Sequence, residues 1–497
     1  MPSLHQSVPQ LRRRRLGVIH LVFFTVAASA PLTVLGGGVT TTFAVTGNAG
    51  APLSFLILAA ALALFAVGYA AMSRHVANAG AFYSYLAKGL GPVWGVSGAF
   101  VALIAYNTIQ IGLYGLFGAG FADFAATALG IDLPWFVWAF ISLVVVGALG
   151  VLRVDLNASV LAVLLILEVI AVVLYDIGAF GNPAGGVVST DGLSPTVLFG
   201  PGVGAVFALG IAAFVGFESG AIYSEECRNP RVTVARATFV ALAFTGLFYA
   251  LSAWAMTVTV GPENLQAAAG ENGPGLVFGA LAEHWSPLVA DIANVLFLTS
   301  VFAALLSFHN GVARYLFALG REDVLPSGLS RVGTRSGSPF TGSLSQSALA
   351  AVVLLAFVLA GSDPVLQLFT WLSGMAAVGV VLLMTGTSAA VVGYFRHHPR
   401  SATTWQRLVA PGAATIVLLA LLLLLIVNFD SLLGTDPTSP LRWILPALVL
   451  LAAVLGAAWG VYLRSRRPDV YGGIGRTAMA PEDEEPIALP TLPQHRY

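Results

Sequence analysis

The sequence predicts an all-α integral membrane protein with twelve transmembrane helices, arranged as two inverted repeats of five helices followed by two more. Three observations predict this class. Of the 497 residues, 57% are apolar and only 9% are charged, whereas a soluble domain carries about 25% charged residues. The apolar residues gather in runs long enough to cross a bilayer, and two of these runs are interrupted at matching positions. This composition excludes an ordinary soluble protein, a nucleic-acid-binding protein with a basic surface and a disordered chain.

The apolar runs define the expected helices. A helix needs about 20 apolar residues to cross the hydrocarbon core, and a transmembrane barrel would instead show short segments that alternate between apolar and polar residues. Neither Leu161–Leu167 nor Leu418–Ile426 alternates, so helices are expected. The single cysteine, Cys227, excludes an internal disulfide and a cysteine-clustered metal site, and no spacing indicates a metal or a cofactor. The twelve runs lie at about 18–45, 52–72, 93–121, 133–152, 157–180, 199–225, 234–260, 286–319, 342–361, 364–395, 408–428 and 441–463.

The basic residues give the orientation of these helices. Arginine and lysine are retained on the cytoplasmic side of a membrane. With the N-terminus inside, every Lys and Arg except Arg442 falls on the cytoplasmic side, and an error of one helix early in the count would scramble this pattern. We therefore expect a multi-pass protein of the cytoplasmic (plasma) membrane, with both the N-terminus and the C-terminus in the cytoplasm.

The first and sixth runs are interrupted in a way that predicts a binding site. The first holds Ala30-Pro31-Leu32-Thr33, in which the proline cannot donate a backbone hydrogen bond, and the sixth holds Phe214-Val215-Gly216-Phe217. Helices 1 and 6 are five apart, so they run in opposite directions, as in inverted repeats with a site between them. The free N–H groups of the second half-helices suit a carboxylate, and the carbonyl groups that end the first halves suit an ammonium group. The alternative is that glycine and proline only permit close packing or a kink here.

The repeats divide the chain into five segments. The last of them is rich in acidic residues and proline, which is typical of disorder. The expected segments are a cytoplasmic N-terminal segment (1–16), the first repeat with helices 1–5 (17–180), the second repeat with helices 6–10 (181–396), helices 11 and 12 (397–463) and a disordered cytoplasmic tail (464–497).

Three motifs in the chain resemble those of the amino acid–polyamine–organocation (APC) superfamily of permeases. The run Asn78–Tyr85 between helices 2 and 3 is similar to the family's Gly-Gly-x-Tyr-x-Tyr segment. The exit of helix 6, Glu225–Pro230, is close to the family's Glu-x-x-Asn-Pro hallmark, and Gly320–Pro326 at the end of helix 8 is similar to Ala-Arg-Asp-Gly-x-Leu-Pro. Together these motifs place helices 1–10 in the family.

This resemblance implies the leucine-transporter fold and proton- or ion-coupled movement of amino acids or related amines. In helix 1 the chain has Pro31-Leu32-Thr33 where family members commonly have Gly-x-Gly, and its triple glycine, Gly36–Gly38, comes later. Carried over by position, the substrate would contact the backbone around Ala30, Pro31, Leu32, Thr33, Phe214, Val215, Gly216 and Phe217.

Two acidic residues within the predicted spans are candidates for coupling. Many proton-coupled relatives carry a lysine near the position of Glu168 in helix 5, but no predicted span of this chain contains a lysine. The buried Glu168 carboxylate could carry the proton instead; the alternative is that it helps to pack helix 5. Glu218 in helix 6 could receive a proton or an amino group, or could cap the broken backbone or serve a gate.

Other polar residues have two interpretations each. The adjacent hydroxyls of Thr299 and Ser300 in helix 8 resemble the sodium ligands of sodium-coupled relatives, although such hydroxyls commonly bond their own backbone. In helix 3, Tyr106 and Gln110 share one face with Tyr114, and this face could line the pathway or form a hydrogen-bonded seam between helices.

The inner mouth carries a charged cluster. Glu225, Glu226 and Arg228 could form a salt-bridge gate that breaks on opening, or a solvated loop. Such surface pairs contribute only about 0–1 kcal/mol, so a weak gate is reasonable. In helix 8, a lone histidine, His309, is expected to be packed rather than to relay protons.

The sequence thus predicts a secondary active transporter, not an enzyme, that moves a small neutral amino acid or related amine by alternating access with proton coupling. Hydrophobic walls and the absence of basic residues in the core of helices 1, 3, 6 and 8 favour a neutral zwitterion. An exchanger and a sodium-coupled symporter are the alternatives, and a nutrient sensor without net flux is the alternative from another class. The expected partners are the amino acid or amine, a proton or sodium ion and the lipid bilayer, with no nucleic acid.

Overall fold

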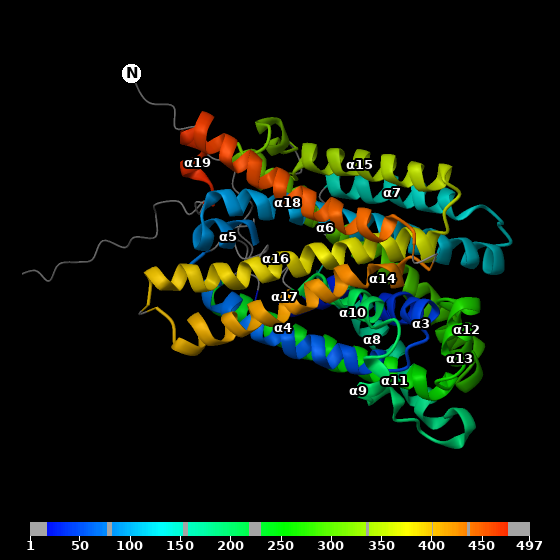
Figure 1. Ribbon diagram of the computed structural model, residues 1–497. Helices are drawn as coiled ribbons and strands as arrows, with labels where there is room; N and C mark the ends of the chain where they lie inside the picture. The colour runs from blue at the N-terminus through cyan, green and yellow to red at the C-terminus, as the bar shows by residue number, and fades with distance from the viewer. Residues whose placement is uncertain are drawn as a thin grey trace, which may run out of the picture.

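Every regular element in the described part of the chain is a helix. The computed structural model describes residues 17–76, 82–152, 158–217, 230–333, 337–399, 401–434 and 438–475. Figure 1 shows the long helices running side by side along one direction, with short helices at the two ends. The prediction of an all-α protein is therefore confirmed.

Ten helices within the described ranges are long and apolar enough to span a membrane. The other two predicted spans, the first and the sixth, are present as shorter pieces. The chain is thus an all-helical integral membrane protein, while the count of twelve spans stays a prediction. The ten helices are α4 (Ala51–Ser73), α6 (Pro92–Leu129), α7 (Trp135–Leu152), α8 (Ala158–Gly181), α11 (Pro230–Val260), α14 (Pro287–Arg321), α15 (Phe340–Leu359), η7 with α16 (Pro364–Phe369 and Thr370–His397), η8 with α17 (Trp405–Val409 and Ala410–Val427) and α18 (Leu441–Arg466).

The first predicted helix is broken at Ala30. Its first half, α1 (Val18–Ser29), ends before this residue, whose φ of 46° and ψ of 78° lie in the left-handed region. Pro31 begins the second half, where its missing N–H is tolerated because the first turn of a helix has no partner for that group. The triple glycine lies inside the second half and does not break it. The second half consists of α2 (Pro31–Thr33), η1 (Val34–Val39) and α3 (Thr40–Thr46).

The sixth predicted helix ends where the second interruption was expected. Its described part is α10 (Val203–Phe214), and the single turn α9 (Pro195–Leu198) precedes the predicted run of 199–225. The backbone of Val215 is extended, and Gly216 has a φ of 111°, which a residue with a Cβ rarely adopts. Residues 218–229 lie outside the described residues, so the structure describes only the beginning of this interruption.

Short helices mark the two ends of the bundle. α5 (Phe82–Leu90) and α19 (Pro468–Gly473) lie at one end, and α9, α12 (Leu265–Asn272) and α13 (Gly275–His284) lie at the other (Figure 1). The remaining short elements are η2 (Ala184–Gly186), η3 (Asp191–Leu193), η6 (Ser327–Ser330) and η9 (Phe429–Leu432).

The start of the expected tail differs from the prediction. α18 continues to Arg466 and α19 follows it, although the sequence predicted disorder from residue 464. Val470 and Ile474 are buried, and this apolar cover explains why the chain stays ordered here. Residues 476–497, like the expected N-terminal segment 1–16, lie outside the described residues.

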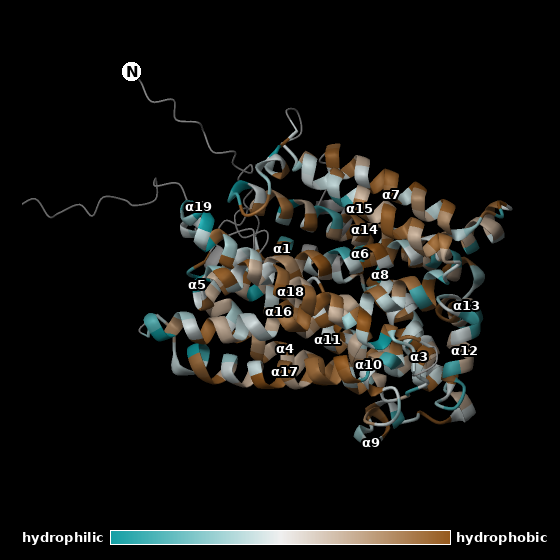
Figure 2. Ribbon diagram, turned by 45° about the horizontal axis from the view of Figure 1, so that its top comes forward, coloured by the Kyte–Doolittle hydropathy of each residue, from teal (hydrophilic) through white to brown (hydrophobic). Residues whose placement is uncertain are grey.

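The outer faces of the long helices are apolar. Figure 2 shows hydrophobic residues along the middle of the helices and hydrophilic residues toward their ends. Leu247, Ile416 and Leu359 are 66%, 72% and 79% exposed, respectively. In water such a surface would mark an interaction site or an aggregation hazard, whereas in a bilayer it contacts hydrocarbon. The pattern therefore fits helices surrounded by lipid.

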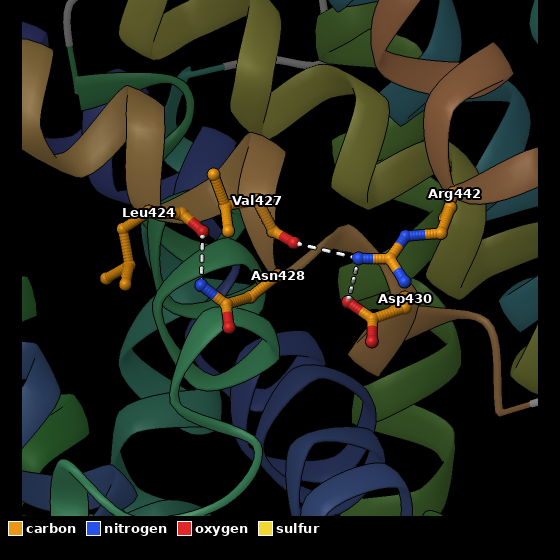
Figure 3. Close-up of polar contacts among 5 residues, drawn as sticks. All are labelled: Leu424, Val427, Asn428, Asp430 and Arg442. Atoms are coloured by element: carbon orange, nitrogen blue, oxygen red, sulfur yellow. Dashed lines mark hydrogen bonds and ion pairs between the residues drawn. The ribbon is translucent and has the colours of Figure 1, made fainter. Parts of the chain in front are cut away.

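The basic residue that departs from the charge pattern has an acidic partner. Arg442 begins α18, and its guanidinium lies 3.8 Å from the Asp430 carboxylate and 3.4 Å from the Val427 carbonyl oxygen (Figure 3). One residue beyond this carbonyl, the Asn428 side chain donates to the Leu424 carbonyl at 2.9 Å and covers the end of α17. The charge of Arg442 is thus balanced locally, although its partners are partly exposed.

Candidate functional site

The break at Ala30 exposes backbone groups that side chains of other helices satisfy. The Tyr249 hydroxyl, from α11, donates to the Ser29 carbonyl oxygen at 3.0 Å and covers the C-terminal end of α1. The Leu32 amide, in the first turn of the second half, donates to the Glu168 carboxylate of α8. Each end of the interruption is therefore held by a side chain from a helix that packs against it.

Glu168 lies at the centre of a buried hydrogen-bonded chain. Its carboxylate is 5% exposed and accepts from the Ser300 hydroxyl of α14 at 2.7 Å. The Thr33 hydroxyl in turn donates to the Ser300 oxygen at 3.0 Å. We call Thr33, Ser300, Glu168 and the Leu32 amide the coupling chain. It joins the second half of the broken helix to α8 and α14.

The coupling chain places a carboxylate where an anionic ligand would bind. The N-terminus of a half-helix carries free N–H groups and the positive end of its dipole, which attract anions. The sequence predicted that the substrate carboxylate would use this position. In the structure the Leu32 amide donates to the protein's own Glu168, so a second carboxylate at this break would meet a like charge.

The predicted pair of sodium-binding hydroxyls does not converge. Ser300 takes part in the coupling chain, whereas the Thr299 hydroxyl donates to the Leu296 carbonyl of its own helix at 2.9 Å. This is the backbone bonding that serine and threonine commonly make in helices. This arrangement supports coupling to sodium less than it supports coupling to a proton.

Both interruptions border one small cavity of about 40 Å³. A water molecule needs about 10–15 Å³ by the same measure, so this conformation has room for roughly three or four waters and would have to widen around an amino acid. Among the residues that the structure describes, its lining is apolar apart from two hydroxyls, and none of these lining side chains is charged. The lining residues are Ser29, Ala30, Thr33, Val34, Gly38, Ile109, Leu113, Leu209, Ala212, Ala213, Val215, Ala304, Phe308 and Phe369.

Three of the predicted substrate-contacting residues line this cavity, namely Ala30, Thr33 and Val215. Pro31 and Leu32 are buried beside it. The structure thus brings the two predicted interruptions to one cavity. Which of these residues contact substrate stays a prediction.

The aromatic residues of the second interruption pack into the bundle. The Phe214 ring lies 6.2 Å from the rings of Phe55 and Tyr249, and the Phe217 ring lies 6.1 Å from that of Phe65. Gly216, between them, supplies the turn. Val215 of this segment therefore lines the cavity, while the two phenyl rings pack into the bundle and hold the segment in place.

The two predicted residues of α6 lie behind the cavity wall. The Tyr106 ring is 6.4 Å from that of Phe308, which does line the cavity. Gln110 bonds to the Gln346 side chain of α15 and lies 3.5 Å from His309 Nδ1 of α14. These contacts match the alternative of a seam between helices.

This seam extends through His309. Its Nε2 lies 2.6 Å from the Ser343 hydroxyl, and the ring is fully buried. On the neighbouring α7, Gly150 leaves room for it, because a Cβ there would lie 2.4 Å from Nε2. We call Gln110, His309, Ser343 and Gln346 the amide seam. The placement agrees with the prediction that His309 is a packed residue.

Two buried polar residues, one in α11 and one in α8, were not singled out from the sequence. Tyr249 gives no sequence signal, because a tyrosine in an apolar helix is common and its role depends on packing against α1. Asp176 could have been found, since it is an acid in an apolar run two turns after Glu168. Its carboxylate is buried and accepts from the Ser252 hydroxyl at 3.0 Å.

The predicted inner gate cannot be placed. Glu225, Glu226 and Arg228, together with the coupling candidate Glu218, lie outside the described residues. They stay predictions.

At the C-terminal end of α14 the structure shows a different polar contact. The Glu322 carboxylate accepts from the Tyr83 hydroxyl and, at 2.9 Å, from the Gly475 amide beyond α19. Burial, together with the nearby Glu322 carboxylate, raises the pKa of the Tyr83 hydroxyl well above its ordinary value. This hydroxyl therefore remains a donor and ties α5 to the end of α14.

Comparisons with known proteins agree on one family. Residues 20–470 match the family model described as "Amino acid permease". The chain is 24% identical to the branched-chain amino acid permease BcaP of Bacillus subtilis, over 66% of this chain and 71% of that protein. It is 29% identical to BcaP of Lactococcus lactis, over 66% and 72%, and 28% identical to the vacuolar cationic amino acid transporter 2 of Arabidopsis thaliana, over 76% and 59%.

Proposed function

Because this chain belongs to the amino acid permease family of the APC superfamily, we propose that it is a secondary transporter that moves a small neutral amino acid together with a proton. Transport proceeds by alternating access across the cytoplasmic membrane. The observation that carries the proposal is the Glu168 carboxylate on the first turn of the broken helix, where the Leu32 amide and the Ser300 hydroxyl donate to it.

The cavity favours an aliphatic side chain. Its walls are formed by residues such as Ile109, Leu113 and Val215, and no charged side chain lines it in the described part of the chain. Burying a charged substrate side chain against these walls would be costly without a partner. The names of the two bacterial relatives concern branched-chain amino acids, so leucine, isoleucine and valine are the first substrates to test.

The coupling follows from like charges at one helix end. An ionised Glu168 occupies the position that attracts a carboxylate, so the substrate carboxylate and the Glu168 carboxylate repel each other there. A proton on Glu168 removes one of the two charges and frees the Leu32 amide for the substrate. Because binding linkage is reciprocal, a bound substrate carboxylate also makes Glu168 hold its proton more tightly.

This linkage gives transport its direction. On the side with the higher proton concentration, a protonated Glu168 and the amino acid bind together. On the other side the proton leaves, the carboxylate takes back the Leu32 amide, and the substrate is repelled from the half-helix. A buried carboxylate without a lysine partner is sufficient for such a cycle.

Uptake into proteoliposomes tests this proposal. Purified protein is given labelled leucine, valine, lysine and glutamate under a proton gradient or a sodium gradient, and isoamylamine serves as a leucine analogue without a carboxylate. We expect leucine and valine to accumulate with the proton gradient, and the amine not to be driven by it. In Glu168→Gln, exchange should persist while accumulation and the dependence on pH are lost. Exposed Glu283→Gln is the matched control and should behave as the parent.

Three outcomes would overturn parts of the proposal. Proton-driven accumulation by Glu168→Gln equal to that of the parent would show that another group carries the proton. Accumulation driven only by sodium would establish the sodium-coupled alternative. Saturable binding without flux or exchange of any amino acid would indicate a sensor.

A further inference from the structure

A large groove lies at the end of the bundle that carries most basic residues, away from the coupling chain. Its volume is about 530 Å³. It is formed by the start of α1, the end of α4, the start of α11 and the start of η8, and α11 packs against both α1 and α4. We call it the Arg74–Arg236 groove. Its lining residues are Val18, Val67, Ala70, Ala71, Arg74, Ala235, Arg236, Phe239, Val240, Trp405 and Gln406.

The groove combines two positive charges with an apolar wall. Arg74 follows α4 directly and Arg236 lies in the second turn of α11, and both side chains are exposed. Within the described ranges neither arginine forms an ion pair, and no carboxylate lines the groove. All other lining residues except Gln406 are apolar or aromatic. Such a site is complementary to a molecule with an anionic head and a hydrocarbon body.

The position of the groove matches the membrane interface. Phe239 and Val240, one turn deeper along α11 than Arg236, are 38% and 51% exposed and face outward. Trp405, which is 51% exposed, belongs to the residue type that gathers where headgroups meet hydrocarbon. The arginines lie where these helices end, on the side that the charge pattern assigns to the cytoplasm. Basic pockets between helices on this side suit anionic headgroups.

We propose that the Arg74–Arg236 groove binds an anionic phospholipid. The two guanidinium groups hold its phosphate, with Arg as the residue best shaped to bind phosphate oxygens. The first part of an acyl chain lies along Val67, Ala71 and Phe239. Free phosphate would leave this apolar wall uncovered, whereas a lipid fills both parts of the groove.

The bound lipid would touch the transport machinery at its edge. Val18 belongs to α1, the first half of the broken helix, and α11 carries Tyr249, which holds the end of that half. A lipid between α1, α4 and α11 therefore favours the conformations in which these three helices keep the present spacing. Lipid binding itself does not depend on the substrate or on the coupling ion.

Native mass spectrometry of the purified full-length protein tests the site directly. The protein is exchanged into detergent with phosphatidylglycerol or phosphatidylcholine, and retained lipid is counted. We expect phosphatidylglycerol to be retained preferentially. Arg74→Gln with Arg236→Gln should weaken its binding by about 25-fold, because each arginine near an anionic surface contributes roughly fivefold. The matched control, Arg464→Gln with Arg466→Gln, removes two arginines of α18 that lie outside the groove and should retain the lipid.

Further measurements keep the test decisive. Arg74→Lys with Arg236→Lys keeps the charge and should recover most of the binding, which separates a lost site from a misfolded protein. Glycerophosphate, which has the headgroup chemistry without acyl chains, should not displace the lipid. A photoreactive amino acid in place of Trp405 should label phosphatidylglycerol. Equal retention by the parent and the Gln pair, displacement by glycerophosphate, or labelling of the chain's own N-terminal segment instead of lipid would each overturn the proposal.

Discussion

Two buried polar clusters cross this helix bundle, and they differ in what they hold together. The coupling chain contains a carboxylate and ends on the backbone of a broken helix, at the Leu32 amide. The amide seam joins three unbroken helices, α6, α14 and α15, through side chains only and contains no carboxylate. Both clusters are buried, so burial alone does not separate them.

The clusters differ in whether their charge and their hydrogen-bond partners can change during transport. A proton on Glu168 changes its charge and its hold on a backbone group that a substrate carboxylate could also use. Gln110 and Gln346 carry no charge at any physiological pH, and their bonds end on side chains that are themselves held. In our proposal the coupling chain serves transport because it joins a carboxylate that can take up a proton to unpaired backbone, whereas the amide seam has neither feature and packs helices.

The largest expected effect comes from removing the Glu168 side chain. Glu168→Ala leaves the Ser300 hydroxyl and the Leu32 amide without this acceptor, and leaving a buried group unpaired costs about 1–3 kcal/mol. We expect both net uptake and exchange to fall to background and the thermal midpoint to drop. Glu168→Gln keeps an acceptor oxygen and should keep exchange. If the alanine variant exchanged substrate as well as the glutamine variant, the backbone contact would have no role in transport.

The sequence could predict the breaks and the acid, but not the groups that meet them. Pro31 and Gly216 disturb helical backbone by their own chemistry, so each break can be located within a few residues. Glu168 is conspicuous as an acid in an apolar run. Tyr249 reaches the break from α11, and the Leu32 amide reaches Glu168 from the broken helix. No local pattern in the sequence says which helices will touch.

The same limit explains why the sequence allowed two interpretations of the polar face of α6, as a lining of the pathway or as a seam between helices. A spacing of four placed Tyr106, Gln110 and Tyr114 on one face, as the structure also shows through the contact between Gln110 and Tyr114. Periodicity gives the face but not the neighbour. Whether the face meets a cavity or another helix depends on packing between segments that are about 200 residues apart in the chain, such as Gln110 and His309.

Substitutions in the amide seam should change stability without changing coupling. Gln110→Leu alone leaves Gln346 without its partner, and we expect a loss of about 1–3 kcal/mol. The double variant with Gln346→Leu should recover most of this loss, because an apolar pair leaves fewer unpaired groups. Thermal unfolding in detergent and the pH profile of leucine uptake measure the two effects. A shift of the pH profile in either variant would contradict the assignment of the seam to packing.

The smallest effect concerns the other side of the break. Tyr249→Phe removes one interhelical hydrogen bond, to the Ser29 carbonyl, and such bonds in membranes contribute about 0.6 kcal/mol on average. Tyr175→Phe is the matched control, since in the described part of the chain the buried Tyr175 hydroxyl has no hydrogen-bond partner. We expect a small drop in the thermal midpoint and in the uptake rate for Tyr249→Phe only, with the ratio of protons to substrate unchanged. If both variants behaved alike, the carbonyl end of α1 would not need this cap. Of the two side chains that hold the break, only Glu168 would then matter for transport.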